Sequence, residues 1–371
     1  MSTISTIANR WALTALTSAV AAIAFVSSSA FAEVSFAGKT VTIIVPFAEG
    51  GGGDTTARLF QPFLQRHLPG NPKVLVFNRP GGAATVGSNY FERKAAPDGL
   101  TGIVISTSTM VSQVFGGGKA KFDVRKWRPV FVVPQDTVFY ARPETGVKGK
   151  NLVDDIMALR KNGIVFGAKN ATSAELRGLV TFQLLGIEKV KTTLGLSSGK
   201  QRSALMRGEL TVNYDSAGSF NAKVRKHAKT GKVVPFMTLG IPQADGSVIK
   251  GPVFPNMPIA LDGYRQLHDG KDPSGDVYAA WLNLVTMGVS ASKGISLPAG
   301  TPDDVLQAWS MAIQKTLKDE EFMEKGRKIM GSYPFTLGKD AAAIYDNAVD
   351  VKPSTRAWMN DFVYDRFGVK I

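Results

Sequence analysis

The sequence predicts an α/β fold with parallel strands, divided into two domains. The chain has 371 residues, and about 340 remain without an N-terminal export signal, enough for two domains of roughly 150 residues each. Short β-branched runs alternate with helical patterns along most of this length, as expected of βαβ units. Several runs end in glycine or hydroxyl loops directly before a helix, and ligands of open α/β sheets bind beyond such strand ends.

The first residues have the pattern of a secretory signal peptide. Arg10 precedes a mostly apolar stretch over residues 11–26, and Ala30-Phe31-Ala32 fits the small-x-small cleavage rule. A membrane anchor is the alternative, but hydroxyl residues interrupt the apolar stretch, which is shorter than the roughly 20 residues of a membrane span. We therefore expect export and cleavage near Ala32.

Composition argues against several classes of site. There is no cysteine, so disulfides, thiolate metal sites and cysteine nucleophiles are excluded. His67, His227 and His268 are far apart and match no common zinc spacing, so we predict no metal and no cofactor. The formal net charge of +14 could attract nucleic acid or acidic small molecules. Because the basic residues are dispersed and no nucleic-acid motif accompanies them, a solvated basic surface is favoured.

The most informative stretch is residues 41–54. A β-branched strand leads into the four glycines 50–53, and Asp54 then opens a helix expected to reach His67, with a kink or break at Pro62. Free amides and the helix dipole make such a junction an anion site. A phosphate-binding P-loop has a Lys followed by Ser or Thr after its glycines. Here an acidic residue and two threonines follow, which argues against a nucleotide.

The same arrangement recurs further along the chain. The strand expected over 74–77 leads through the small-residue loop 78–85 to a helix over 86–94, and the strand 101–105 ends in the hydroxyl cluster 106–109. A linking segment then leaves this domain around Pro134. The second unit is expected to contain helices over 152–161, 174–185, 199–207 and 221–230, and strands over 164–167, 191–194 and 210–214. A further strand over 233–237 is a candidate for the return to the first domain.

The last third of the chain begins with a change of composition. Residues 242–275 are rich in Gly, Pro and Asp with little periodicity, and they predict a long surface excursion. Residues 277–287 are apolar again. The expected C-terminal helices span residues 302–316, 320–330, 341–351 and 355–364.

Several motifs, taken in their order and spacing, resemble one family. They are Val45-Pro46-Phe47-Ala48 with Gly50, Gly51 and Asp54; Asn78-Arg79-Pro80-Gly81; Gly87; Pro97-Asp98-Gly99; and Pro298-Ala299-Gly300-Thr301-Pro302. Over nearly the whole mature chain, the sequence resembles the Bug family of periplasmic solute-binding proteins, the receptors of tripartite tricarboxylate transporters.

The resemblance implies an α/β, two-lobed periplasmic-binding-protein fold of type II, a Venus flytrap with two strands crossing at the hinge. Lobe 1 would contain residues 33–137 and 239–371, lobe 2 residues 138–238, and the signal peptide residues 1–32. Its implied function is capture of a small mono-, di- or tricarboxylic acid in the interlobe cleft. The periplasmic receptor, expected to be a monomer, would deliver this ligand to membrane permease subunits of a tripartite tricarboxylate transporter.

The resemblance also implies a set of ligand-binding residues on three loops and one strand end. They are Phe47, Ala48, Gly50 and Gly51; Gly82 and Ala83; Ala171, Thr172 and Ser173; and Asp215. From the residues alone, the glycines could form a tight turn, Thr172 and Ser173 could be helix caps, and Asp215 could be a turn residue.

The chain also departs from the family pattern near the expected cleft. Glu49 stands where the family usually has proline, and Glu175-Leu176 replaces a common histidine-leucine pair. Residues 192–196 differ from the usual Val-Pro-Tyr-Lys-Gly, and the excursion 242–275 is longer than usual. The departures at Glu49, Glu175 and residues 192–196 affect the identity of the ligand and leave the expected fold unchanged.

Two alternatives to a transport receptor remain. A ligand sensor for a membrane signalling partner would use the same flytrap. A secreted hydrolase would need an activated hydroxyl nucleophile. The chain has no Gly-x-Ser-x-Gly elbow and no histidine near Ser106 or Ser173 in sequence, so we expect a binding protein rather than an enzyme.

Overall fold

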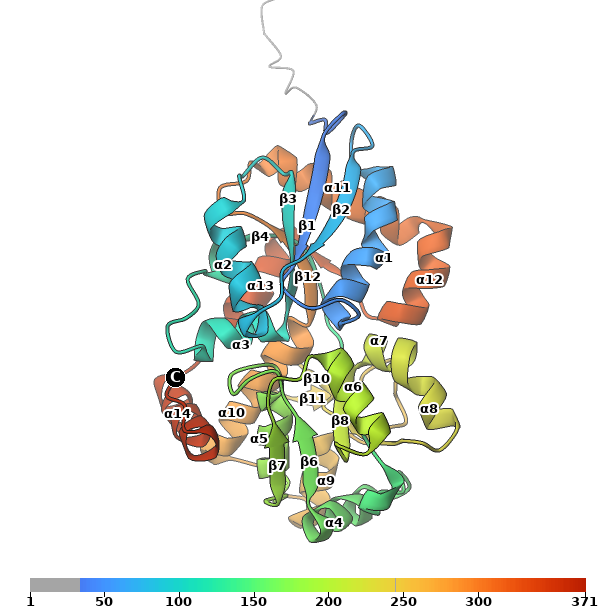
Figure 1. Ribbon diagram of the computed structural model, residues 1–371, viewed down its shortest axis with the longest axis vertical. Coiled ribbons are helices and arrows are strands. Elements are labelled where there is room, and N and C mark those ends of the chain that lie inside the picture. The colour runs from blue at the N-terminus through green and yellow to red at the C-terminus, as the bar shows by residue number, and fades with distance from the viewer. Residues whose placement is uncertain (1–33, 244) are drawn as a thin grey trace, which may run out of the picture. The chain divides into compact units, whose positions relative to one another are not determined.

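Two β-sheets organise the chain in the computed structural model, which describes residues 34–243 and 245–371 (Figure 1). The expected signal peptide, residues 1–32, lies outside the described residues. We call the elements around the upper sheet of Figure 1 the first lobe and those around the lower sheet the second lobe. Every described helix is too short or too polar to span a bilayer.

The first-lobe sheet has six strands in the order β13-β4-β12-β3-β1-β2. β1 pairs in parallel with β2 and β3, whereas β12 is antiparallel to β3 and β4. Val41, Ile43 and Val45 of β1 are fully buried, as expected of a central strand covered on both faces. The strands are β1 (Thr40–Val45), β2 (Lys73–Asn78), β3 (Thr101–Ser106), β4 (Arg128–Val133), β12 (Lys293–Leu297) and β13 (Thr336–Leu337).

The second-lobe sheet has five strands in the order β7-β6-β8-β5-β9. β5 lies antiparallel between β8 and β9, and β6 pairs in parallel with β7 and β8. A separate short hairpin joins β10 (Ile241–Pro242) to β11 (Val248–Ile249). The strands of this sheet are β5 (Thr137–Ala141), β6 (Ile164–Gly167), β7 (Val190–Thr193), β8 (Val212–Ser216) and β9 (Val234–Thr238).

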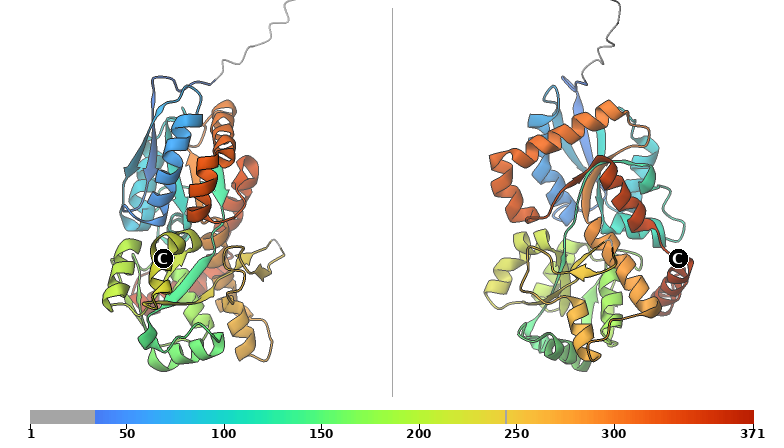
Figure 2. Two further views of the ribbon diagram at one scale, coloured as in Figure 1. Left: turned by 90° about the vertical axis from the view of Figure 1, so that its right-hand side faces the viewer. Right: turned by 180° about the vertical axis from the view of Figure 1, so that it is seen from behind.

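Helices flank both sheets, as the views in Figures 1 and 2 show. Around the first sheet are α1 (Gly52–His67), α2 (Thr85–Lys94), α3 (Thr107–Phe115), α11 (Asp303–Lys318), α12 (Glu320–Met330) and α13 (Gly338–Val349). Around the second are α4 (Leu152–Asn162), α5 (Leu176–Leu184), α6 (Ser198–Arg207), α7 (Ala217–Ser219), α8 (Arg225–Lys229), α9 (Ala260–Leu267) and α10 (Gly275–Val285). The C-terminal helix α14 (Pro353–Phe367) packs against α10 and α3.

The chain passes between the two sheets at two adjacent segments. One joins β4 to β5, and the other joins the π-helical turn η5 (Thr286–Ser290) to β12. The Gln135 amide donates a hydrogen bond to the Val289 carbonyl (3.0 Å), which holds the segments side by side. Asp136, in the first of these segments, is buried, and burial raises its pKa to about 6, while donors including the Gly240 amide oppose this rise.

The second crossing corrects the expected lobe boundary at residue 239. β9 pairs with β5 in the second sheet, α9 packs on α4, and α10 packs on α5. The chain therefore returns to the first sheet only at β12, a strand that the sequence did not predict. Lys293, Gly294 and Ser296 interrupt its apolar pattern, and this hides a fully buried central strand from pattern reading.

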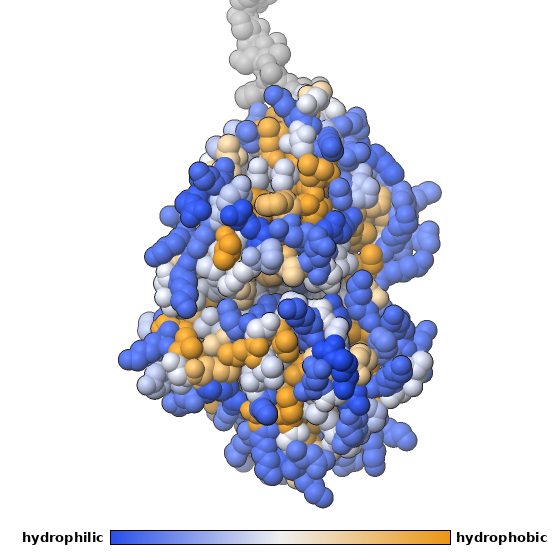
Figure 3. Space-filling model, in the orientation of Figure 1, coloured by the Kyte–Doolittle hydropathy of each residue, from blue (hydrophilic) through white to orange (hydrophobic). Residues whose placement is uncertain are grey.

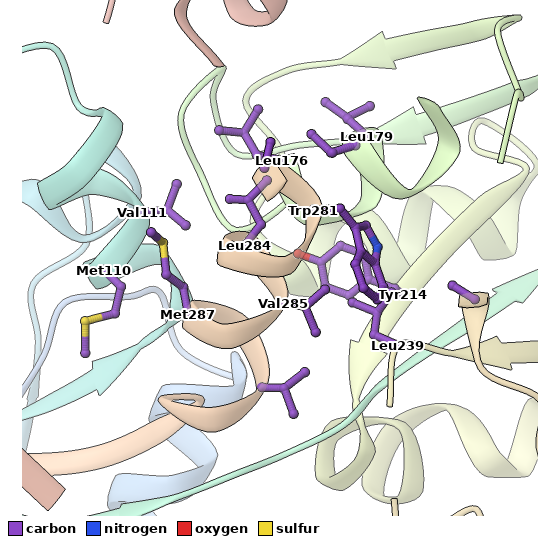
Figure 4. Packing of buried hydrophobic residues seen from close by; sticks show 14 of the residues in the cluster. Met110, Val111, Leu176, Leu179, Tyr214, Leu239, Trp281, Leu284, Val285 and Met287 are labelled. Carbon is purple, nitrogen blue, oxygen red and sulfur yellow. The ribbon is translucent and has the colours of Figure 1, made fainter. Parts of the chain in front are cut away.

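An apolar cluster fills the region where the lobes meet. Trp281 of α10 also donates a hydrogen bond to the Thr181 hydroxyl of α5 (3.0 Å). The cluster joins both lobes into one hydrophobic core near the crossings. Figure 4 shows Met110 and Val111 of α3, Leu176 and Leu179 of α5, and Trp281, Leu284, Val285 and Met287 of α10 and η5.

The expected break of α1 at Pro62 is wrong, because the helix continues to His67. Pro62 is exposed, so its ring lies on the solvent side. The helix there loses one backbone hydrogen bond without opening a buried polar group.

Candidate functional site

A cavity of about 280 Å³ lies between the two sheets. Its walls are the loops after β1, β2 and β3 of the first lobe and the loops after β6, β7 and β8 of the second, together with Lys293 of β12. Figure 3 shows the surface hollowed between the two halves of the molecule. The volume suits a small organic molecule, and strand ends are where α/β sheets bind ligands.

The β1–α1 loop places Gly51, Gly52 and Gly53 on the cavity wall. Gly51 is the N-cap of α1, and no side chain caps it. The first intrahelical bond runs from the Thr55 amide to the Gly51 carbonyl (2.9 Å), so the Gly52 and Gly53 amides have no helical partner. A Cβ on Gly53 would lie 2.8 Å from the Phe47 ring. Glycine is therefore required for this close approach, and the dipole of the 16-residue helix favours an anion at its end.

Asp54 stabilises the loop through hydrogen bonds to its carboxylate. Its carboxylate accepts hydrogen bonds from the Gly50 amide (2.9 Å), the Asn78 amide group (2.9 Å) and the Arg58 Nε (3.0 Å). Burial alone would raise the pKa of Asp54, but these donors hold it below its usual value. Asp54 thus fixes the preceding turn rather than capping the first helical amides. Glu49 is exposed at the rim, 3.7 Å from Arg58.

The β2–α2 loop has an unusual backbone. Ala83 and Ala84 both have positive φ, 54° and 100°, next to Gly81 and Gly82 with φ of 140° and 56°. Non-glycine residues in this region carry strain that concentrates at functional sites. The Ser112 hydroxyl donates to the Ala83 carbonyl (3.1 Å) and helps to hold the turn against the cavity.

The hydroxyl cluster after β3 forms the start of α3. Ser106 is the N-cap of this helix, and Ser106, Thr107 and Ser108 line the cavity. The Ser108 hydroxyl accepts a hydrogen bond from the Ala174 amide (3.3 Å), and the Thr107 hydroxyl accepts one from Arg177 (3.3 Å). These bonds link the two lobes at the inner end of the cavity.

The β6–α5 loop is closed by its own side chains. Ser173 is fully buried and donates to the Glu175 carboxylate, which also accepts from Lys169 and from Gln201 (3.1 Å). Burial alone would raise the pKa of Glu175, but Lys169 and the other donors hold it below its usual value. α5 begins at Leu176 with Glu175 at the N-cap position, so the interpretation of Thr172 or Ser173 as N-cap is wrong.

Asp215 reaches the cavity from β8 but is already paired. Its carboxylate accepts from Arg202 (2.7 Å) and from the Tyr140 hydroxyl (2.8 Å). Burial raises the pKa of Asp215, while Arg202 and Tyr140 oppose this rise. Arg202 also donates to the Gly50 carbonyl of the first lobe (3.0 Å), so it joins the two lobes.

Two cavity residues, Arg177 and Lys293, were not expected from the sequence. Both are more than nine-tenths buried. Arg177 donates to the Gly288 carbonyl (2.7 Å) and lies over the Tyr214 ring, 4.6 Å from its centroid. In sequence, Lys293 lies between Ser292 and Gly294, and no motif marks it.

The structure brings half of the expected ligand-binding residues to the cavity. Phe47, Ala48, Gly51, Ala83 and Asp215 line it. The other five do not: Gly50 and Gly82 are exposed, Ala171 and Ser173 are buried, and Thr172 is half-buried outside the lining.

No group of His, Asp and Glu side chains that could hold a metal ion occurs within residues 34–243 and 245–371. No family model matches this chain, and no curated protein is similar to it at a significant level.

Solved structures of periplasmic binding proteins have the same fold. BugD is 19% identical and matches with a TM-score of 0.65 over 89% of this chain and 98% of its own. MatC from Rhodopseudomonas palustris, solved with malate, is 19% identical, with a TM-score of 0.63 over 87% of this chain and 98% of its own. Another R. palustris protein, solved with adipate, is 16% identical, with a TM-score of 0.64 over 89% of this chain and 98% of its own. The predicted α/β, two-lobed periplasmic-binding-protein fold is thereby confirmed.

Proposed function

We propose that this chain is a periplasmic solute-binding receptor of the Bug family that captures a small carboxylic acid between its lobes. The observation that carries the proposal is the uncapped N-terminus of α1, which borders the cavity between the lobes. Amides of the β1–α1 loop would bind one carboxylate, with Phe47, Ala48, Gly51 and Ala83 forming the wall around it. The structural neighbours solved with malate and adipate support this ligand class.

Capture would follow a hinge mechanism. Hydrogen bonds from Arg202 to Gly50, from Ala174 to Ser108 and from Arg177 to Thr107 join the lobes around the cavity. A ligand that contacts both lobes adds further contacts that exist only in the closed state. Binding of the ligand therefore favours that state. The proposed receptor delivers its ligand unchanged to a membrane permease of the tripartite tricarboxylate type, and the chain performs no chemistry.

A carboxylate panel tests this proposal. We expect the purified mature protein to be stabilised by about 2.7 kcal/mol when a bound acid is present at 100 times its Kd, seen as a rise in melting temperature. Mass spectrometry of the released ligand should show the acid unaltered. A flat response across mono-, di- and tricarboxylates would contradict the ligand class, and a turnover product would contradict the binding role.

A further inference from the structure

The cations of the cavity wall are not all balanced by carboxylates. Lys169, Arg177 and Lys293 line the cavity. Lys169 is paired with Glu175, and Asp215 is paired with Arg202. Within the described parts of the chain, no carboxylate oxygen lies within 4.0 Å of Arg177 or Lys293. Two buried cations therefore face the cavity without a counter-ion, an arrangement that is unfavourable unless a ligand supplies the charge.

Lys293 lies directly at the N-terminus of α1. A Cβ on Gly52, the first residue of α1, would be 3.2 Å from Lys293 Cε and 3.7 Å from its Nζ. The ammonium donates to the Ser292 carbonyl (3.1 Å) and hydroxyl (3.4 Å), both neutral groups. An ammonium beside the positive end of a helix dipole adds to the positive potential there. A side chain on Gly52 would contact Lys293 and also Ser219, whose Oγ would lie 3.0 Å from the added Cβ, so glycine lets the ammonium approach the start of the helix.

The surroundings of Lys293 disfavour its charge when no anion is bound. Burial, followed by Arg177 and Lys169, lowers the pKa of Lys293 to about 7, with only Asp215 opposing. β3 has no charged residue, and Asp54 of α1 is turned to Gly50 and Asn78.

We propose that Lys293 is the counter-ion of the ligand and that, with Arg177, it makes the cleft select a dicarboxylate over a monocarboxylate. This inference rests on the proposed function and assigns its specificity. One carboxylate would bind between the Gly52 and Gly53 amides and the Lys293 ammonium. The second negative charge would balance Arg177, whose Nε has no hydrogen-bond partner among the described residues. A monocarboxylate would leave one of the two cations unbalanced.

Calorimetric titration with matched acids tests the charge count. Succinate and butyrate share a four-carbon chain, and adipate and hexanoate share a six-carbon chain, so each pair differs by one carboxylate. We expect wild-type protein to bind at least one diacid at least about 30-fold more tightly than its monoacid. Lys293→Met should weaken diacid binding by about the same factor and reduce the preference for the diacid, whereas Lys39→Met, at an exposed position, should change neither.

Proton linkage separates a counter-ion from a structural lysine. An anion beside Lys293 raises its pKa above the value of about 7 in the free protein. At pH 8, diacid binding should therefore take up close to one proton, measured by titration in buffers of different ionisation enthalpy. Affinity should fall about tenfold per pH unit above 7. Both effects should vanish in Lys293→Met, which should melt at or above the wild-type temperature because an unbalanced buried ammonium is removed.

The outcomes distinguish this inference from the proposed function. If wild-type protein binds the monoacids as tightly as the diacids, or if Lys293→Met keeps the preference and the proton uptake, the inference is overturned while carboxylate capture stands. If no carboxylate of any class binds to the wild-type protein, the proposed function and the inference both fall.

Discussion

The β1–α1 and β6–α5 loops have the same sequence pattern and opposite properties. Each follows a short buried strand, contains small residues and precedes a helix. In the first loop, no side chain among the described residues caps the helix, and Gly51, Gly52 and Gly53 line the cavity. The second is crossed by a hydrogen-bonded network of the buried Ser173, Glu175 and Gln201 with the partly exposed Lys169. A strand, a small-residue loop and a helix are therefore not sufficient for an anion site. The hydrogen-bond donors of the loop must also be free of partners from the loop's own side chains.

The position of the acidic residue explains this difference. Asp54 lies in the first turn of α1 and bonds back to Gly50, Asn78 and Arg58, behind the loop. Glu175 directly precedes α5, lines the cavity and forms an ion pair with Lys169. The carboxylate of Asp54 therefore stabilises the first loop without occupying its cavity side, whereas the carboxylate of Glu175 occupies the cavity side of the second loop.

Replacing Glu175 should change the protein more than any other substitution in these two loops. Glu175→Gln removes a buried charge and leaves Lys169 without its partner, so we expect a loss of about 3 kcal/mol in the free energy of unfolding, measured by urea denaturation. Because Lys169 then adds a free positive charge to the cavity wall, affinity for a bound diacid should rise. Lost affinity with unchanged stability would mean that Glu175 contacts the ligand.

An exposed pair provides the control for this variant. Glu209 is bonded to Arg207, and both side chains are more than half exposed. Glu209→Gln removes the same charge from a solvated site, and we expect no measurable change in stability or in binding.

Replacing Asp54 should have the next largest effect. Asp54→Asn turns one acceptor into a donor that faces the Gly50, Asn78 or Arg58 donors, so we expect a loss of about 2 kcal/mol in stability. The loop should also loosen, and carboxylate affinity should fall with it. Isothermal titration and urea denaturation of the same preparations would measure both.

The pH dependence of Asp54→Asn checks the cause. The pKa of Asp54 is held below its usual value in the folded protein, so its stabilisation is fully present above the unfolded-state pKa of about 4 and is lost as pH falls through the folded-state pKa. The stability gap between wild type and variant should be constant from pH 7 to about 5 and should narrow in more acidic solution. A gap that stays constant into strong acid would exclude the carboxylate as its source.

Local sequence patterns predicted most helices and strands of the fold. They failed where packing between segments distant in sequence determines whether a strand forms or which lobe a segment joins. The strand expected over 164–167 coincides with β6, and the helix expected over 320–330 coincides with α12. β12 was missed because its Lys293 and Ser296 are polar although the strand is buried. The return to the first lobe was placed too early because nothing local shows that α10 packs on α5.

The candidate site shows the same division. Glycine and hydroxyl loops at strand ends are visible in sequence, and the loops after β1, β2 and β3 do line the cavity. Arg177 and Lys293 come from an ordinary helix and an unrecognised strand, and only the folded chain brings them to the cavity wall. Sequence patterns locate loops, but they do not show which side chains the tertiary fold leaves without partners.

Replacing Thr172 should have the smallest effect on stability and affinity, and it tests directly whether the β6–α5 loop contacts the ligand. Its side chain is half-buried outside the cavity lining, and its hydroxyl forms no hydrogen bond with another described residue. Thr172→Val should therefore change neither ligand affinity nor melting temperature beyond about 0.5 kcal/mol.

Ser173→Ala is the matched variant in the same loop. It removes a buried donor to Glu175, and we expect a loss of about 1 kcal/mol in stability with little change in affinity. If Thr172→Val instead weakens ligand binding while its melting temperature stays at the wild-type value, the hydroxyl contacts the ligand. The second loop would then share the ligand-binding role that we propose for the first.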